Sequence, residues 1–246
     1  AFEYMTEQAQ EKYIGMKVFP IQRVQKQSAE YPVIPLEALT ETPETARAAR
    51  GNYNRSDWNF DFQNYSTKDR GWEELVDDRE AALYASYFDM EVASTLRAVA
   101  IILRAHEIRV RDKALDTTQL ANAAVSISWA TPGTATPKSD VDTAKGAMRS
   151  AYGVLPNVMT ISWARFQALL RTSEVKDALK YTSPIELGGF EVQKRLMAQY
   201  FGVNEVLVGD ALYNTSKKGQ TASLGEIWTA TKVGLYAVSA GTDDMK

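Results

Sequence analysis

The residues from Trp72 to Thr131 contain no glycine and no proline, although six such residues lie between Pro20 and Gly71. A stretch so free of helix breakers favours a long helix. Its apolar residues recur at steps of three and four, apart from one step across His106, and they predict one helix over residues 78 to about 112. This apolar stripe consists of Ala85, Phe88, Val92, Leu96, Val99, Leu103 and Val110.

The charges at the two ends of this stretch fit the same helix. Carboxylates gather before and at its start and basic side chains at its end, which is the arrangement that complements a helix dipole. At 1.5 Å per residue the helix would be about 50 Å long, well above the usual length. The acidic group is Glu73, Glu74, Asp77, Asp78 and Glu80, and the basic group is Arg104, Arg109, Arg111 and Lys113.

The composition is that of a folded protein whose core needs no covalent support. Of 246 residues, 45% are apolar and 24% charged, which suggests one large domain or two modest ones. The chain has no cysteine, and its single histidine, His106, excludes metal sites built from several histidines. The net charge of -3 argues against a strongly basic nucleic-acid surface. The longest aliphatic run, residues 98–103, is too short to cross a membrane.

Two stretches before the helix predict a hairpin. Residues 57–64 alternate aromatic with polar side chains, which is typical of a strand. Residues 28–37 contain two prolines and suit an edge strand. We expect residues 28–70 to form a long hairpin that projects from the body and requires a partner surface, because its apolar content is too sparse for a core.

Seven residues of this hairpin are candidates for contacts between subunits. The basic ones stand among carboxylates, and a solvated loop explains that pattern as well as an interface does. The aromatic ones could stack on nucleic-acid bases, but alternation on a strand more often reflects packing. The candidates are Arg47, Arg50, Arg55, Trp58, Phe60, Lys68 and Arg70.

Residues 120–238 are expected to form a compact mixed α/β body. Periodicity predicts its elements, with Ser139 or Asp140 as the cap of one helix and Gly153 and Gly202 as the ends of two helices. They predict strands at 124–129, 157–161 and 205–209, one or two strands within 226–238, and helices at 139–152, 164–170, 174–179 and 190–201.

Four features could carry chemistry, and a structural role is favoured for each. His106 is a lone histidine beside Glu107, and the acidic group before the long helix is expected on electrostatic grounds alone. The pair at 188–189 lacks the spacing of a phosphate loop, and Ser162 lacks the glycines of a nucleophile elbow. We therefore predict no catalytic residue, no cofactor and no metal site.

The order of the elements resembles the major capsid proteins of tailed double-stranded DNA bacteriophages, which share the Hong Kong 97-type fold. Residues 16–37 are similar to the passage from an N-terminal arm into an extended loop, and residues 76–80 to the start of the spine helix. Residues 227–228 resemble the strand that returns to the peripheral domain. Four further stretches resemble successive pieces of an axial domain, namely residues 129–140, 156–160, 179–182 and 203–214. The resemblance covers most of residues 10–240.

The resemblance implies an α+β protein of five parts and a structural function without an active site. The parts are an N-terminal arm (1–27), an extended β-hairpin loop (28–76), a peripheral domain with the spine helix (77–128), an axial domain (129–224), and a return strand with a tail (225–246).

It also implies the partners and the location. Copies of the chain would form pentamers and hexamers of an icosahedral shell in the virion, assembled in the host cytoplasm. The shell would contact packaged double-stranded DNA weakly and non-specifically. Scaffolding, portal and decoration proteins are further candidate partners, and no membrane is involved. An encapsulin-like compartment is an alternative, and a soluble α/β enzyme is a remote one.

Overall fold

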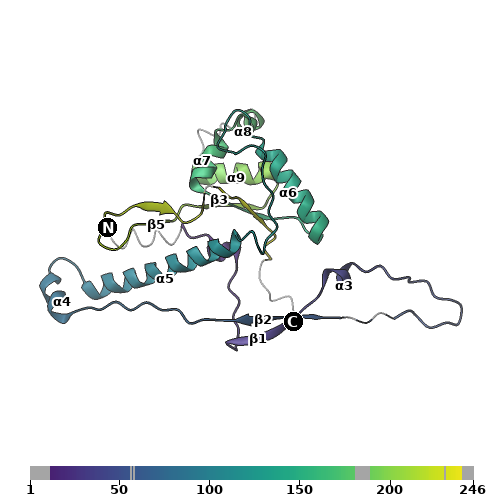
Figure 1. The fold of residues 1–246 in the computed structure, drawn as a ribbon, viewed down its shortest axis with the longest axis horizontal. Coiled ribbons are helices and arrows are strands. Elements are labelled where there is room, and N and C mark those ends of the chain that lie inside the picture. Colours follow the sequence, from purple (N-terminus) through teal and green to yellow (C-terminus); the bar gives the residue numbers. More distant parts are fainter. Residues whose placement is uncertain (1–11, 56, 58, 181–188, 230, 240–246) are drawn as a thin grey trace. The chain divides into compact units, whose positions relative to one another are not determined.

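The computed structural model describes residues 12–55, 57, 59–180, 189–229 and 231–239 (Figure 1). These residues form two units: residues 22–70 make one, and the flanking residues, up to 21 and from 71 onward, make the other. Trp58 and the residues at 181–188 lie outside the described part of the chain.

The unit of residues 22–70 is a hairpin. Strand β1 (Ser28–Val33) pairs antiparallel with β2 (Asp61–Ser66), in a register that places Ser28 opposite Ser66. The short helix α3 (Leu36–Thr40) follows β1. The predicted hairpin is confirmed, although its second strand begins four residues later than the start of the predicted strand. None of the described residues from 22 to 70 is buried, so the hairpin has no core of its own.

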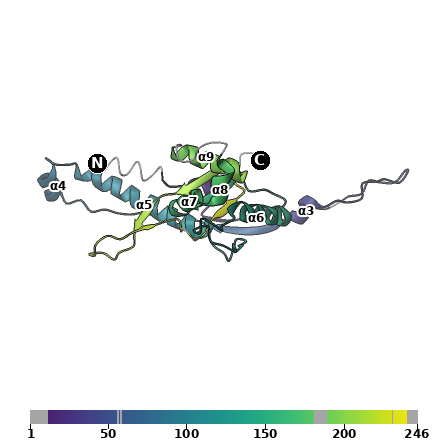
Figure 2. The ribbon, with the colours of Figure 1, turned by 90° about the horizontal axis from the view of Figure 1, so that it is seen from above.

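The predicted long helix is two helices, α4 (Asp78–Tyr84) and α5 (Met90–Ala114). Asp89 ends the continuity, because its side chain accepts hydrogen bonds from the backbone N–H groups of Glu91 and Val92 and so caps α5. Stacking of Tyr84 on Phe88, with ring centroids 5.9 Å apart, accompanies the turn. The prediction of one unbroken helix is therefore wrong. At 25 residues, α5 is still about 37 Å long, and it is visible in both ribbon views (Figures 1 and 2).

The body is built on a three-stranded sheet with β3 in the centre. Strand β3 pairs parallel with β4 and antiparallel with β7. Strands β5 and β6 form a separate antiparallel pair. The bounds of the elements in this unit are α2 (Gly15–Val18), α6 (Pro137–Tyr152), β3 (Val158–Ser162), α7 (Trp163–Leu170), α8 (Ser173–Leu179), α9 (Phe190–Phe201), β4 (Glu205–Gly209), β5 (Leu212–Asn214), β6 (Leu224–Glu226) and β7 (Gly234–Tyr236).

Each side of the sheet faces a different apolar cluster. Met159 and Ile161 of β3 belong to the cluster that contains Phe166 of α7 and Phe201 of α9. Val158 of the same strand belongs to the second cluster, which joins α2, the end of α5 and the segment around Trp228. Successive residues of a strand point to opposite faces. The strand at 157–161 therefore connects two cores, which explains why β3 is buried along its whole length.

Most of the elements predicted in the body are confirmed, with two corrections. Residues 124–129 form no strand, and their side chains up to Ser128 are exposed. Helix α6 begins at Pro137 with Thr136 at the N-cap, not at a cap formed by Ser139 or Asp140. Proline suits a first helical position because it lacks the N–H that would go unpaired there. The predicted helix stop at Gly153, with φ of +70°, is confirmed.

Tyr200 on α9 provides a spectroscopic test of this packing. Its ring lies 5.1 Å from that of Phe201 between centroids, and Lys138 Nζ is 5.9 Å from its centroid. Burial raises the pKa of Tyr200 to about 12, and the carboxylates of Glu174 and Asp142 add to the rise. In the unfolded state the Tyr200 hydroxyl would lose its proton at a lower pH than in the folded state. The contribution of this group to the free energy of unfolding is therefore complete below pH 10 and declines as the pH rises toward 12.

We therefore expect Tyr200→Phe to remove one tyrosine from the late phase of an alkaline titration followed by tyrosinate absorbance. An unaltered late phase in the Tyr200 variant would contradict the packing of this partly buried side chain against the body.

Candidate interaction surface

The far end of the hairpin is a closed, basic loop. Asn54 Nδ2 donates to the Glu44 carbonyl oxygen at 2.7 Å, and the guanidinium carbon of Arg47 lies 4.7 Å from the centroid of the Tyr53 ring. Gly51 N donates to the Ala48 oxygen, and Arg50 has a φ of +63°. We call residues 45–55 the hairpin tip. It contains three arginines and no carboxylate.

The structure brings only some of the seven predicted contact residues together. Arg47, Arg50 and Arg55 share the hairpin tip, where all three are exposed. Phe60 precedes β2, and Lys68 and Arg70 follow it, so these three lie along the hairpin and not in the tip; all are exposed. Trp58 lies outside the described residues. The assignment of the seven to subunit contacts remains a prediction.

A second exposed surface surrounds α4, and the sequence did not single it out as an interaction site. Within α4 and the segment before it, Asp77 accepts from Arg79 N and caps the helix, as the electrostatic interpretation predicts. Glu74 has another role: it lies 2.8 Å from Arg97 Nη1 and accepts from Trp72 Nε1. The apolar stripe of the predicted helix is largely unburied here, and Phe88, Val92 and Val99 are exposed.

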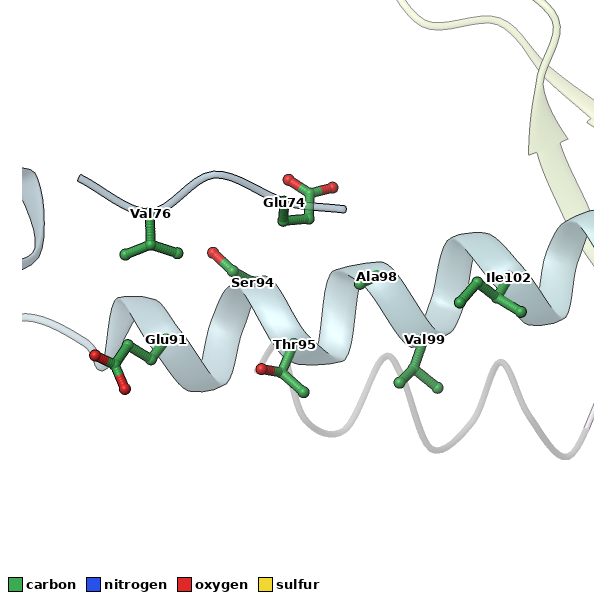
Figure 3. Close-up of a pocket in the computed structure, with 8 residues that line it drawn as sticks. All are labelled: Glu74, Val76, Glu91, Ser94, Thr95, Ala98, Val99 and Ile102. Carbon is green, nitrogen blue, oxygen red and sulfur yellow. The ribbon is translucent and has the colours of Figure 1, made fainter. Parts of the chain in front are cut away.

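A groove of about 300 Å³ lies between this segment and α5 (Figure 3). Ala98, Val99 and Ile102 give it apolar walls, and the carboxylates of Glu74 and Glu91 stand at its rim. The remaining lining residues are Val76, Ser94 and Thr95.

The least expected group in the body is Glu107 on α5, which is buried with 1% of its surface exposed. Its carboxylate accepts from Ile14 N and Gly15 N at 2.9 Å each and from Trp228 Nε1 at 2.7 Å. Three segments far apart in sequence therefore meet at one anion. The pKa of nearby Tyr13 is raised, chiefly by burial. The Arg104 cation opposes this rise, and the Glu107 anion adds to it.

The features weighed for chemistry have structural surroundings. Ser162 is buried and its hydroxyl accepts from Arg165 N, so it caps α7. His106 Nε2 is buried without a hydrogen-bond partner in the described part of the chain. Gly189 is the N-cap of α9. Among the residues that the structure describes, no three His, Asp or Glu side chains gather as a metal site, and no helix is long and apolar enough to cross a membrane.

Comparisons with known proteins identify relatives of the chain. No protein-family model matches it. Over 237 residues, which is 92% of this chain and 71% of the relative, it is 25% identical to the major capsid protein of Burkholderia phage BcepMu. The crystal structure of a phage-related protein from Bordetella bronchiseptica RB50 superposes with a TM-score of 0.65 at 25% identity, covering 98% of this chain and 78% of that one. The chain is a distant homologue of a bacteriophage major capsid protein, and the resemblance predicted from the sequence is confirmed at that level.

Proposed function

We propose that this chain is the structural subunit of a phage capsid, and that copies of it assemble into a closed shell. The relationship to a major capsid protein over 92% of the chain supports a structural, non-enzymatic role. The observation that carries the proposal is the hairpin of residues 22–70, a unit in which no described residue is buried. A unit without a core depends on packing partners, and assembly provides them.

The finer proposal is the Hong Kong 97-type organisation. The hairpin would be the extended loop, α5 the spine helix, and the sheet with α6 to α9 the axial domain. Residues 1–27 would be the arm and residues 225–246 the return strand and tail. The order of elements along the chain supports these assignments. Pentamers and hexamers of such a subunit would close an icosahedral shell.

The electrostatics support a shell that encloses DNA without binding it tightly. A net charge of -3 gives little attraction to phosphates, so contacts with double-stranded DNA would be weak and non-specific. The subunit would assemble in the host cytoplasm and reside in the virion. Scaffolding, portal and decoration proteins are candidate partners of the assembled shell.

Assembly of the purified chain tests the proposal. We expect sedimentation velocity to show large particles and negative-stain electron microscopy to show closed shells of uniform size. A monomer at every concentration, with no rings or shells, would refute the proposed function. Particles isolated from producing cells should contain double-stranded DNA, and a protein cargo in its place would indicate an encapsulin-like compartment.

A further inference from the structure

One face of α5 carries a row of apolar side chains that is covered at one end only. At the C-terminal end, Val110 is 7% exposed and belongs to the cluster that contains Ile14 and Val18. Toward the start of the helix, Val92 is 49% exposed and Val99 38%. Exposed apolar side chains along one helix face indicate a surface that packs against another element.

The contacts of the N-terminal segment with α5 give the direction in which that segment runs. Ile14 N and Gly15 N donate to Glu107, at sequence separations of 93 and 92 residues. The Arg104 cation, about one turn earlier in α5, lies near the Tyr13 hydroxyl. As the residue number falls in the N-terminal segment, the contacted position in α5 falls with it. The two segments are therefore parallel, and the residues that precede them in sequence are directed along the uncovered part of α5.

Residues 1–11 lie outside the described part of the chain, and their sequence has an amphipathic pattern. Phe2, Met5 and Ala9 recur at steps of four and three, so they would share one face of a helix. The carboxylates of this segment recur at steps of four and would share the opposite face. These carboxylates are Glu3, Glu7 and Glu11. A helix of this length is marginal alone in water, so its apolar face requires a surface to pack on.

The length of this segment matches the length of the uncovered surface. We call Val92, Leu96, Val99 and Leu103 the α5 stripe; it contains no charged residue. As a helix, residues 1–11 would be about 16 Å long, and the α5 stripe is about as long from its first residue to its last. With the separations of the described contacts, Met5 falls close to Leu96.

We propose that residues 1–11 form an amphipathic helix that packs along the α5 stripe of the same copy. Phe2, Met5 and Ala9 contact the stripe, and the carboxylates of the segment face away from it. The contact extends the second apolar cluster from its described end at Val110 toward the start of α5. Because it lies within one chain, this contact does not depend on the proposed shell function.

A pair of introduced cysteines tests the register, since the chain has no cysteine of its own. The double variant Met5→Cys with Leu96→Cys should form a disulfide within one chain under mild oxidation. The matched control, Met5→Cys with Ser94→Cys, should not, because Ser94 faces the segment of Glu74 and Val76 (Figure 3). Peptide mass spectrometry identifies the disulfide. Equal oxidation of the two pairs, or of neither pair, would overturn the contact.

A mixture of single variants distinguishes contact within one copy from exchange between copies. Proteins that carry only Met5→Cys and only Leu96→Cys are mixed and oxidised under the same conditions. The mixture should yield no more disulfide-linked dimer than either protein yields alone, as measured on a non-reducing gel. An excess of dimer in the mixture would show that residues 1–11 pack on a second copy, and would refute the contact as proposed.

Thiol labelling tests whether residues 1–11 cover the α5 stripe. In the unassembled full chain, Val92→Cys should react with a maleimide about tenfold more slowly than in a chain without residues 1–11, because labelling requires local opening. Adding Met5→Glu should restore the fast reaction. Gln10→Glu makes the same change of charge on the side of the carboxylates, and should keep the reaction slow. Equal rates in the full and shortened chains would refute the proposal, whether or not the protein forms shells.

Discussion

Replacing Glu107 by leucine is expected to lower the free energy of unfolding by about 3 kcal/mol or more, because three N–H groups lose their acceptor. The carboxylate is 1% exposed and receives Ile14 N, Gly15 N and Trp228 Nε1. Leucine fills a similar volume but accepts nothing, so the desolvation of the three donors is no longer compensated. Denaturant unfolding of the unassembled subunit, followed by tryptophan fluorescence, measures the change.

The comparison with other substitutions isolates the role of the anion. Glu107→Gln keeps one acceptor oxygen and should cost less than leucine, whereas Glu91→Leu changes an exposed carboxylate on the same helix and should have little effect. Equal losses for Glu107→Leu and Glu91→Leu would contradict the proposed anchor.

Gly15 is the backbone side of the same anchor. A Cβ at this position would lie 2.5 Å from Glu107 Oε2 and 3.1 Å from Val110 Cβ, so alanine pushes α2 away from α5. Gly15→Ala should therefore destabilise the subunit as well. Because both changes break the same bonds, the double variant should lose less stability than the two separate losses combined.

The sequence predicted what local patterns determine. Alternating aromatic residues and two prolines predicted the hairpin, whose strands indeed pair. Glycines 153 and 202 marked helix ends, and both adopt positive φ. The break before α5 was missed because Phe88 and Val92, on either side of Asp89, keep the helical spacing, and only the capping bonds of Asp89 show that a new helix begins there. Residues 124–129 have the composition of a strand, but the structure pairs them with none.

Long-range geometry explains what the sequence could not predict. The donors to Glu107 are 92, 93 and 121 residues away, so no local pattern identifies them. The apolar stripe has a gap at His106. This gap was a local sign that polar side chains lie on the face of α5 that packs against the core. The exposed surface around α4 was also missed, because carboxylates near a helix start have a sufficient local explanation. The structure shows that these carboxylates near the start of α4 are exposed, so they can also contact a partner.

Deleting residues 38–56 is expected to abolish closed shells while leaving the body folded. None of the described residues in this range is buried, so their removal takes no apolar contact from either core. We expect the free energy of unfolding of the body to change by less than about 0.5 kcal/mol. The buried rings of Trp129 and Trp228 report on that body, so their fluorescence should retain its unfolding midpoint.

Assembly and folding should separate in this variant. Shells require each subunit to contact several neighbours, and the deletion removes all three arginines of the hairpin tip together with the last three residues of α3. A chain of the same length made of glycine and serine in place of residues 38–56 controls for the spacing of the strands and should also fail to assemble. Normal shells from either variant in electron micrographs would show that assembly does not use the tip. Both variants keep β1 and β2. Such an outcome would therefore indicate that the strands of the hairpin, where Phe62 is exposed, make its essential contacts.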